Sequence, residues 1–336
     1  LAQGELYAYL ICANEGIPEA EVTLCYYRLD GAENRFRRGY TLKQLRERFL
    51  SLARPYAGWV AALEEWKEQS APTISSMKFP FAHYRDGQRE MAAQVYYAMR
   101  DGGRALIEAP TGIGKTAAAL FGALKALGKG KVTALFYLTA RTTGRRAAEL
   151  ALDKMREQGL KLRSIAITAK EKCCLLEKKE CFGCPYAADY YERRRDALRE
   201  ALHIEAATAQ TIHDLAVEYE LCPYELSLDM SEQADVIICD YNYAFDPRVR
   251  LKRYFDQKSK AGLLIDEAHN LPDRARDMLS VELSGTRVEE TRRLVGRYEG
   301  RVSPTYQALT ALLKALTREM SEPEALSEVP EEFPRA

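Results

Sequence analysis

The chain has 336 residues, with 49 basic and 49 acidic side chains and a formal net charge of zero. This length suffices for two or three domains, and 47% hydrophobic with 29% charged residues is typical of a soluble globular protein. No apolar run approaches the roughly 20 residues of a membrane span, and no signal peptide is visible. We therefore expect a cytoplasmic protein with no membrane partner, in which any nucleic-acid site is a local patch of charge.

The N-terminal part, residues 1–68, is predicted to be one unit. Its expected elements are a helix over 3–14, a strand over 21–27, a pairing segment at 35–37 and a helical region over 42–68. Pro55 is a candidate break in that last helical region. Residues 69–81 are rich in serine and proline and are predicted to be a linker.

From residue 82 onward, strand and helix patterns alternate, which predicts a parallel sheet covered by helices. The expected elements are strands at 105–108, 132–138, 162–168, 235–239 and 261–265 and helices at 117–127 and 145–158. Residues 171–224 interrupt the alternation. After Pro272 the pattern is helical to about residue 320. The predicted fold class is therefore α/β, with a helical C-terminal part.

The run APTGIGKT at positions 109–116 connects an expected strand to an expected helix. This is the context of a phosphate-binding loop, in which glycines allow backbone N–H groups to surround an anion. Lys115 can reach the β- and γ-phosphates of ATP, and the Thr116 hydroxyl can bind Mg²⁺. The residues assigned to the nucleotide are Thr111, Gly112, Gly114, Lys115 and Thr116.

The sequence Asp-Glu-Ala-His follows the last expected strand, at positions 266–269. A carboxylate at the end of a buried strand can hold the Mg²⁺–ATP complex, and a second one can orient and deprotonate the attacking water. We assign Asp266 to the metal and the nucleotide, and Glu267 to the water. His269 either couples the ATP state to movement or caps the next segment.

Five of the eight cysteines lie in or at the end of the interrupting segment, which favours a metal site over disulfides. They are Cys173, Cys174, Cys181, Cys184 and Cys222. The spacing of Cys181 and Cys184 lets two thiolates reach one metal centre. Spacing alone leaves an iron–sulfur cluster and a tetrahedral zinc site equally open. The remaining cysteines, Cys12, Cys25 and Cys239, lie in apolar patterns typical of a core.

Residues 141–200 carry 15 basic and 10 acidic side chains, which gives a local excess of positive charge. The triplet Arg193-Arg194-Arg195 lies near Tyr186, Tyr190 and Tyr191. Basic charge interleaved with aromatic rings is suited to single-stranded nucleic acid. A solvated helix face would show the same charge run.

The order of a phosphate loop, a four-cysteine insert and Asp-Glu-Ala-His resembles the XPD/DinG family of iron–sulfur superfamily 2 DNA helicases. Residues 84–88 resemble the glutamine motif of this family, in which Gln88 would read the adenine. Residues 138–142 resemble motif Ia, which grips the DNA backbone, and residues 221–226 resemble the fourth-ligand motif.

The resemblance implies a 4Fe-4S cluster on Cys174, Cys181, Cys184 and Cys222. It also implies an ATP- and Mg²⁺-dependent helicase or translocase that acts on single-stranded or forked DNA in repair or replication, as a monomer. The implied division is a RecA-like motor domain at 82–170 and 225–272, an iron–sulfur domain at 171–224 and part of a helical arch domain at 273–336.

The segment Gln3-Gly4-Glu5-Leu6-Tyr7 resembles the helix that closes RecB-like PD-(D/E)XK nuclease domains, which some bacterial DinG-like proteins carry. We therefore expect residues 1–68 to be the end of such a domain, and the chain to be a fragment cut at both ends. The second motor domain, with its arginine finger, is expected in the full-length chain. Two other functions stay open: a non-catalytic DNA-binding module in which ATP sets the conformation, and a zinc-binding P-loop ATPase acting on proteins.

Overall fold

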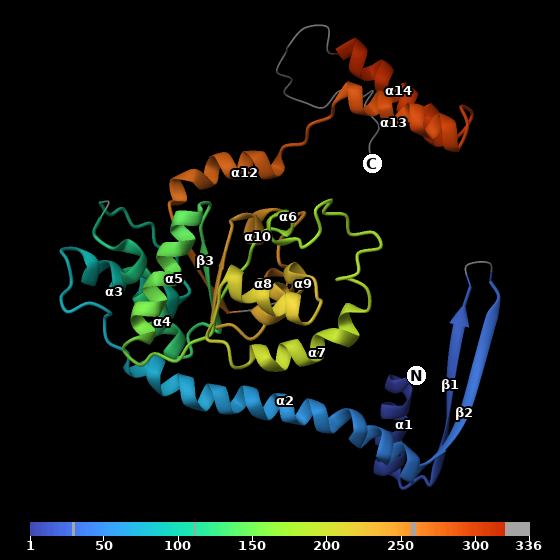
Figure 1. Cartoon of the computed structure of the whole chain (residues 1–336), viewed down its shortest axis with the longest axis horizontal. Coiled ribbons are helices and arrows are strands. Elements are labelled where there is room, and N and C mark those ends of the chain that lie inside the picture. Colours follow the sequence, from blue (N-terminus) through green and yellow to red (C-terminus); the bar gives the residue numbers. More distant parts are fainter. Residues whose placement is uncertain (29–30, 111, 257–259, 320–336) are drawn as a thin grey trace. The chain divides into compact units, whose positions relative to one another are not determined.

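The structure is a computed structural model, and it describes residues 1–28, 31–110, 112–256 and 260–319 (Figure 1). The chain divides into two compact units, residues 1–268 and residues 269–336, and each is described by itself.

The chain begins with a helix and a two-stranded hairpin, α1 (Ala2–Glu15), β1 (Glu19–Tyr27) and β2 (Glu33–Thr41). The strands pair antiparallel along their whole length, which confirms the predicted helix and strand pairing. A small core of its own joins these elements, made of Cys12, Val22, Tyr40 and Leu45.

A single long helix, α2 (Leu42–Ser76), follows the hairpin. The predicted break at Pro55 is absent, and residues 69–76, predicted as linker, are helical. A proline inside a helix costs about 3 kcal/mol, but both ends of α2 are held. Thr41 forms a capping box at the start, and Ser75 donates to the Gly128 carbonyl, 3.0 Å away, near the end.

The centre of the first unit is a five-stranded parallel sheet with the order β5-β4-β6-β3-β7. The strands are β3 (Ala134–Leu138), β4 (Ser164–Ala166), β5 (Ala206–Ala207), β6 (Val236–Cys239) and β7 (Ala261–Ile265). Every paired neighbour is parallel, as the alternation of strand and helix predicts. The α/β fold class is confirmed.

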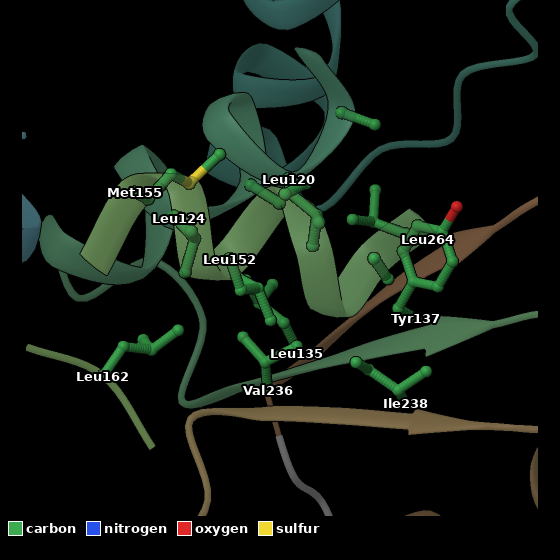
Figure 2. Close-up of a cluster of buried hydrophobic side chains, with 14 of the residues drawn as sticks. Leu120, Leu124, Leu135, Tyr137, Leu152, Met155, Leu162, Val236, Ile238 and Leu264 are labelled. Atoms are coloured by element: carbon green, nitrogen blue, oxygen red, sulfur yellow. The ribbon is translucent and has the colours of Figure 1, made fainter. Parts of the chain in front are cut away.

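Helices of the first unit surround this sheet. They are α3 (Gln88–Asp101), α4 (Lys115–Gly128), α5 (Thr142–Arg156), α6 (Lys170–Cys173), α7 (Tyr190–Ala201), α8 (Ala209–Glu218), α9 (Pro223–Ser231), α10 (Asn242–Phe245) and α11 (Lys252–Phe255). Figure 2 shows α4 and α5 packing their leucines on one face, against Leu135 and Val236. On the opposite face, the ring of Phe136 contacts Tyr254 and Phe255.

The strand register brings three strand ends to one edge of the sheet. Leu138, the last residue of β3, is paired with Cys239 of β6 and with Ile265 of β7. Ligands of parallel α/β sheets bind at the carboxyl ends of the strands. The residues that directly follow these three strands are therefore in the position expected of a site.

Two predictions about this sheet need correction. The expected strand at 105–108 is not formed, and Leu106 is 95% exposed. A strand needs a hydrogen-bonded neighbour, and β7, the edge strand, is paired with β3 alone. In addition, the predicted insert at 171–224 encloses β5 and α8, and β5 pairs with β4 of the sheet.

Up to residue 319, where the described residues end, the second unit is helical, as expected after Pro272. Its elements are a 3₁₀ turn, η1 (Ala268–Asn270), which begins at the junction, and the helices α12 (Leu271–Leu279), α13 (Gly285–Tyr298) and α14 (Pro304–Glu319). Arg292 of α13 donates to the Tyr306 hydroxyl of α14 and lies over its ring. Across the part of the chain that the structure describes, we find no helix whose length and apolar character would let it cross a membrane.

Candidate functional site

The glycine-rich loop leads directly into α4, which begins at Lys115. Gly112 and Gly114 have φ angles of +85° and +81°, in the left-handed region that glycine adopts without strain. A Cβ on Gly114 would lie 2.6 Å from the amide nitrogen of Gln88, so a larger residue here would also displace the end of that side chain. Thr111, assigned to the nucleotide, lies outside the described residues.

Gln88 lies against this loop and is only 2% exposed. Its side-chain oxygen accepts a hydrogen bond from the Arg85 backbone, 2.7 Å away, and its amide donates to the Ile113 carbonyl. Arg85 donates to the Gly112 carbonyl. In this structure the side chain of Gln88 therefore holds the loop. Recognition of the adenine base by Gln88 stays a prediction.

The Asp-Glu pair stands at the carboxyl edge of the sheet, as the sequence predicts. The Asp266 backbone N–H donates to the Leu138 carbonyl, 2.9 Å away, and Glu267 has a left-handed φ of +49°. The Lys115 ammonium lies 3.3 Å from a carboxylate oxygen of Glu267. The fold therefore brings the phosphate loop and the Asp-Glu pair together across 152 residues of sequence.

Two tyrosines support this edge, and sequence reasoning gave neither of them a role. The Tyr137 hydroxyl lies 3.3 Å from that of Thr116. Burial raises the pKa of Asp266, and hydrogen bonding with Tyr137 partly offsets that rise in pKa. Tyr241, which is fully buried, donates to the Asp266 carbonyl and to the Glu267 carbonyl. Nothing in the strand patterns of the sequence marked Tyr137 or Tyr241.

The first turn of α5 is packed tightly against the same carboxylate. A Cβ on Gly144 would lie 2.2 Å from the Thr139 hydroxyl and 2.8 Å from Asp266 Oδ2. Both distances are shorter than a real Cβ allows. Any larger side chain at Gly144 would displace Asp266 or Thr139.

His269 is the first residue of the second unit. Its ring nitrogen Nε2 lies 3.2 Å from the side-chain nitrogen of Asn270. Its role toward nucleotide stays a prediction.

The four predicted cluster cysteines lie on three segments of the first unit. Cys174 directly follows α6, Cys181 and Cys184 lie in the loop before α7, and Cys222 precedes the first residue of α9. The Cys184 backbone N–H donates to the Cys181 carbonyl, 3.3 Å away, and the Cys222 N–H donates to the Tyr186 carbonyl, 2.9 Å away. Two of the segments are thereby joined through their backbones.

The donor chemistry of this set fits a thiolate-bound cluster. All four cysteines are free thiols, and hydrogen bonding to Cys181 raises the pKa of the Lys170 ammonium. Within the described ranges, however, no three or more histidine, cysteine, aspartate or glutamate side chains are grouped closely enough to hold a metal ion. The structure brings the segments together without converging the four sulfur atoms.

Cys173 has surroundings that suit a protonated thiol. Burial raises its pKa to about 11, and its Sγ donates to the carbonyls of Thr168 and Lys170 at 3.8 and 3.7 Å. Burial raises the pKa of the Cys222 thiol as well, so the omission of Cys173 from the ligand set stays a prediction.

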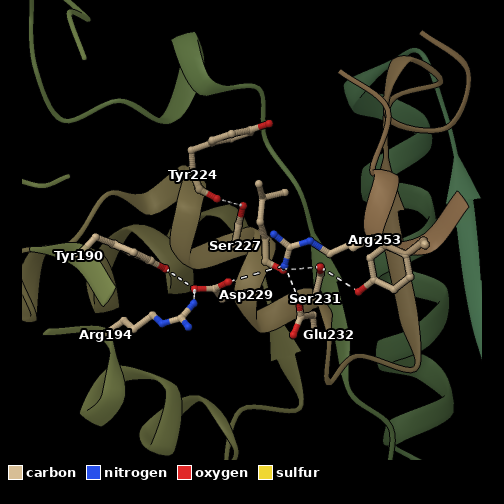
Figure 3. Close-up of polar contacts among 10 residues, drawn as sticks. Tyr190, Arg194, Tyr224, Ser227, Asp229, Ser231, Glu232 and Arg253 are labelled. Atoms are coloured by element: carbon tan, nitrogen blue, oxygen red, sulfur yellow. Dashed lines mark hydrogen bonds and ion pairs between the residues drawn. The ribbon is translucent and has the colours of Figure 1, made fainter. Parts of the chain in front are cut away.

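The arginine triplet of α7 differs from the predicted DNA patch. Arg193 donates to backbone carbonyls, and Arg194 forms an ion pair with Asp229 (Figure 3). Arg195 is exposed. The count of charges over residues 141–200 could not predict these contacts, because backbone carbonyls carry no charge and Asp229 lies outside that range.

Comparison with known proteins agrees with this geometry. The DEAD_2 family model matches residues 155–288. The regulator of telomere elongation helicase 1 homolog of Caenorhabditis elegans is 28% identical over 258 residues, which is 63% of this chain and 26% of that protein. The XPD helicase subunit of the general transcription and DNA repair factor IIH of Dictyostelium discoideum is 19% identical over 238 residues, 61% of this chain and 30% of that protein.

The fold has a counterpart among solved structures. An XPD helicase structure superimposes with a TM-score of 0.53 and 23% identity, covering 75% of this chain and 44% of that one. The sequence matches show that this chain is similar to helicases of these kinds, and the solved structure shows a shared fold. The chain spans about a quarter of the length of the first curated relatives that it matches.

Proposed function

We propose that this chain is the first motor half of an ATP-dependent DNA helicase or translocase, which binds and hydrolyses Mg²⁺–ATP and engages single-stranded or forked DNA. The observation that carries the proposal is the approach of Lys115 to Glu267 at the carboxyl edge of the sheet, at 3.3 Å. A lysine at the start of a helix, after a glycine loop and beside an acidic pair, is the arrangement that phosphoryl transfer requires.

Each residue has one proposed task in this reaction. The backbone N–H groups of the glycine loop and the start of α4 would bind the phosphates, and Lys115 would neutralise the β- and γ-phosphate oxygens. Glu267 would orient the attacking water and accept its proton. The Thr116 hydroxyl and the Asp266 carboxylate would hold Mg²⁺, which would offset the negative charge of the phosphates.

The proposal includes a 4Fe-4S cluster on Cys174, Cys181, Cys184 and Cys222. It is supported by the four free thiols and by the backbone hydrogen bond between the Cys184 and Cys222 segments. The cluster would hold the cysteine insert in shape. No step of ATP hydrolysis depends on it.

The remaining parts of the proposal concern the surroundings of this motor half. Residues 1–68 would be the end of a nuclease-like domain, in which the predicted motif residues Gln3 and Tyr7 are hydrogen-bonded at 3.3 Å. A second motor domain would supply the arginine finger, and the protein would act as a monomer in DNA repair or replication. Its eight free thiols are typical of a reducing compartment such as the cytoplasm.

Titration of the chain with a fluorescent ATP analogue, with and without Mg²⁺ and single-stranded DNA, tests this proposal. We expect saturable, Mg²⁺-strengthened nucleotide binding and DNA binding that weakens with salt. Absence of nucleotide binding by a folded chain would contradict the proposed motor function. Binding of nucleotide without any affinity for DNA would favour the protein-directed ATPase.

A further inference from the structure

The side chain of Arg193, in the first turn of α7, connects two segments that each carry a predicted cluster cysteine. One terminal guanidinium nitrogen donates to the Pro185 carbonyl at 2.8 Å and to the Ala188 carbonyl at 2.7 Å. The other donates to the Glu220 carbonyl at 2.7 Å. Pro185 directly follows Cys184, and Glu220 lies two residues before Cys222.

The carbonyl of Glu220 lies at the C-terminal end of α8. Glu220 has a φ of +51°, and its N–H and that of Leu221 donate to the carbonyls of Val217 and Ala216, the hydrogen bonds that end a helix at a left-handed residue. Two residues beyond Glu220, the Cys222 N–H donates to the Tyr186 carbonyl at 2.9 Å. The side chain of Arg193 and this backbone bond therefore fasten the same two segments at neighbouring points.

The helix that carries Arg193 is itself fixed to α9. Figure 3 shows Tyr190 and Arg194 converging on Asp229 of α9, and the Tyr190 hydroxyl donates to its carboxylate at 2.8 Å. Residues spaced three and four apart share one side of a helix. Since α9 begins directly after Cys222, these contacts keep the first turn of α7 at a set distance from Cys222.

We propose that Arg193 is a positioning residue for the cysteine site, which fastens the Cys184 and Cys222 segments to each other so that both can contribute to a shared metal centre. The inference rests on the proposed cluster. This role takes the place of the DNA contact that we predicted from the charge of Arg193, because the guanidinium donors of Arg193 are directed at protein carbonyls. A planar guanidinium donates in several fixed directions at once, which the single ammonium of lysine cannot reproduce.

The test compares Arg193→Ala and Arg193→Lys with Arg199→Ala. Arg199 lies on the same helix, is exposed and pairs locally with Asp196 at 3.0 Å, so its removal controls for loss of an arginine from α7. Two quantities are measured for each protein after anaerobic purification. They are the iron and sulfide content per chain, and the hydrogen-exchange rate of the Cys222 amide.

We expect both Arg193 variants to lose most of their iron, and the Cys222 amide to exchange at least about tenfold faster as its hydrogen bond to Tyr186 opens. Arg199→Ala should match the wild type in both measurements. Unchanged ATP-analogue binding would show that the sheet remains folded in the Arg193 variants. Wild-type iron content together with wild-type exchange in Arg193→Ala would overturn the inference.

The two measurements also separate this inference from the proposed cluster. If the wild-type chain holds no iron, the proposed cluster is wrong, and the exchange rate alone decides whether Arg193 fastens the segments. If the wild type holds iron and Arg193→Ala retains it, the cluster stands and the positioning role fails.

Discussion

The ammonium nitrogen of Lys115 and Oε1 of Glu267 lie 3.3 Å apart, which joins the phosphate loop to the acidic pair. Both side chains are partly exposed, at 29% and 44%, and such pairs contribute only about 0–1 kcal/mol. An incoming phosphate carries more charge than one carboxylate. Phosphate can therefore displace Glu267 from Lys115, and this displacement would free Glu267 to face water.

Replacing Lys115 with alanine should abolish nucleotide binding, because the β- and γ-phosphates would lose their cationic partner. The measurement is titration with a fluorescent ATP analogue in the presence of Mg²⁺. Lys125→Ala is a suitable control, since Lys125 lies on the same helix and donates to the Ser75 carbonyl. Nucleotide affinity that is indifferent to Lys115→Ala would contradict the site assignment.

The Glu267→Gln variant should bind Mg²⁺–ATP as well as the wild type or up to about fivefold more tightly, because Lys115 loses a competing carboxylate. Hydrolysis should fall to background, since glutamine cannot accept the proton of the attacking water. Single-turnover hydrolysis measures the second effect.

The wild-type chain should itself hydrolyse ATP slowly, because an arginine finger is worth about 10³–10⁵ in rate. Wild-type turnover of several per second would contradict the proposed need for a second motor domain.

Tyr137→Phe should weaken the binding of Mg²⁺ at the nucleotide site. Nucleotide binding measured without Mg²⁺ should not change. The phenylalanine ring preserves the buried packing of Tyr137, but the hydroxyl that lies beside Thr116 and Asp266 is lost. We expect the Mg²⁺ concentration for half-maximal binding to rise by about three- to tenfold, as for loss of one hydrogen bond. Tyr254→Phe, which removes a hydroxyl near Ser231 on the other face, should have no such effect.

The parts of this site that the sequence predicts are those determined by local chemistry. Gly112 and Gly114 have the left-handed backbone that their residue type suggests, and the predicted strand 261–265 matches β7. Parallel pairing then places Asp266 beside the phosphate loop without further information.

The parts that sequence reasoning missed depend on partners far along the chain. The charge of Arg193 indicated nucleic acid, but the carbonyl of Glu220 lies 27 residues away and carries no sequence signal. Pro55 suggested a helix break, yet anchoring at both ends keeps α2 continuous. The apolar run at 105–108 suggested a strand, but a strand also needs a neighbour, which residue type cannot supply.

Replacing Cys222 with serine should remove the colour of an iron–sulfur cluster, expected near about 400 nm, and lower the bound iron. Cys239→Ser is the matched control. Cys239 is buried in β6, and burial raises the pKa of its thiol, so it is held protonated. Stoichiometric zinc without iron in anaerobically purified protein would contradict the proposed 4Fe-4S cluster and support the zinc alternative.

The exposed arginines at two ends of the basic segment should contribute to binding of single-stranded DNA. Arg141 precedes the first residue of α5 in the motif Ia-like stretch, and Arg195 is the one exposed member of the triplet. The double variant Arg141→Ala/Arg195→Ala should weaken binding equally for all sequences. The slope of log affinity against log salt should fall by about 0.7 for each lost phosphate contact. Fluorescence anisotropy of labelled oligonucleotides at several salt concentrations gives both quantities.

The control variant is Arg100→Ala, which removes an exposed arginine paired with Asp101 on α3. It should leave both the affinity and its salt dependence unchanged. Salt-independent affinity, equal in the wild type and the double variant, would show that this positive charge is only a solvated surface.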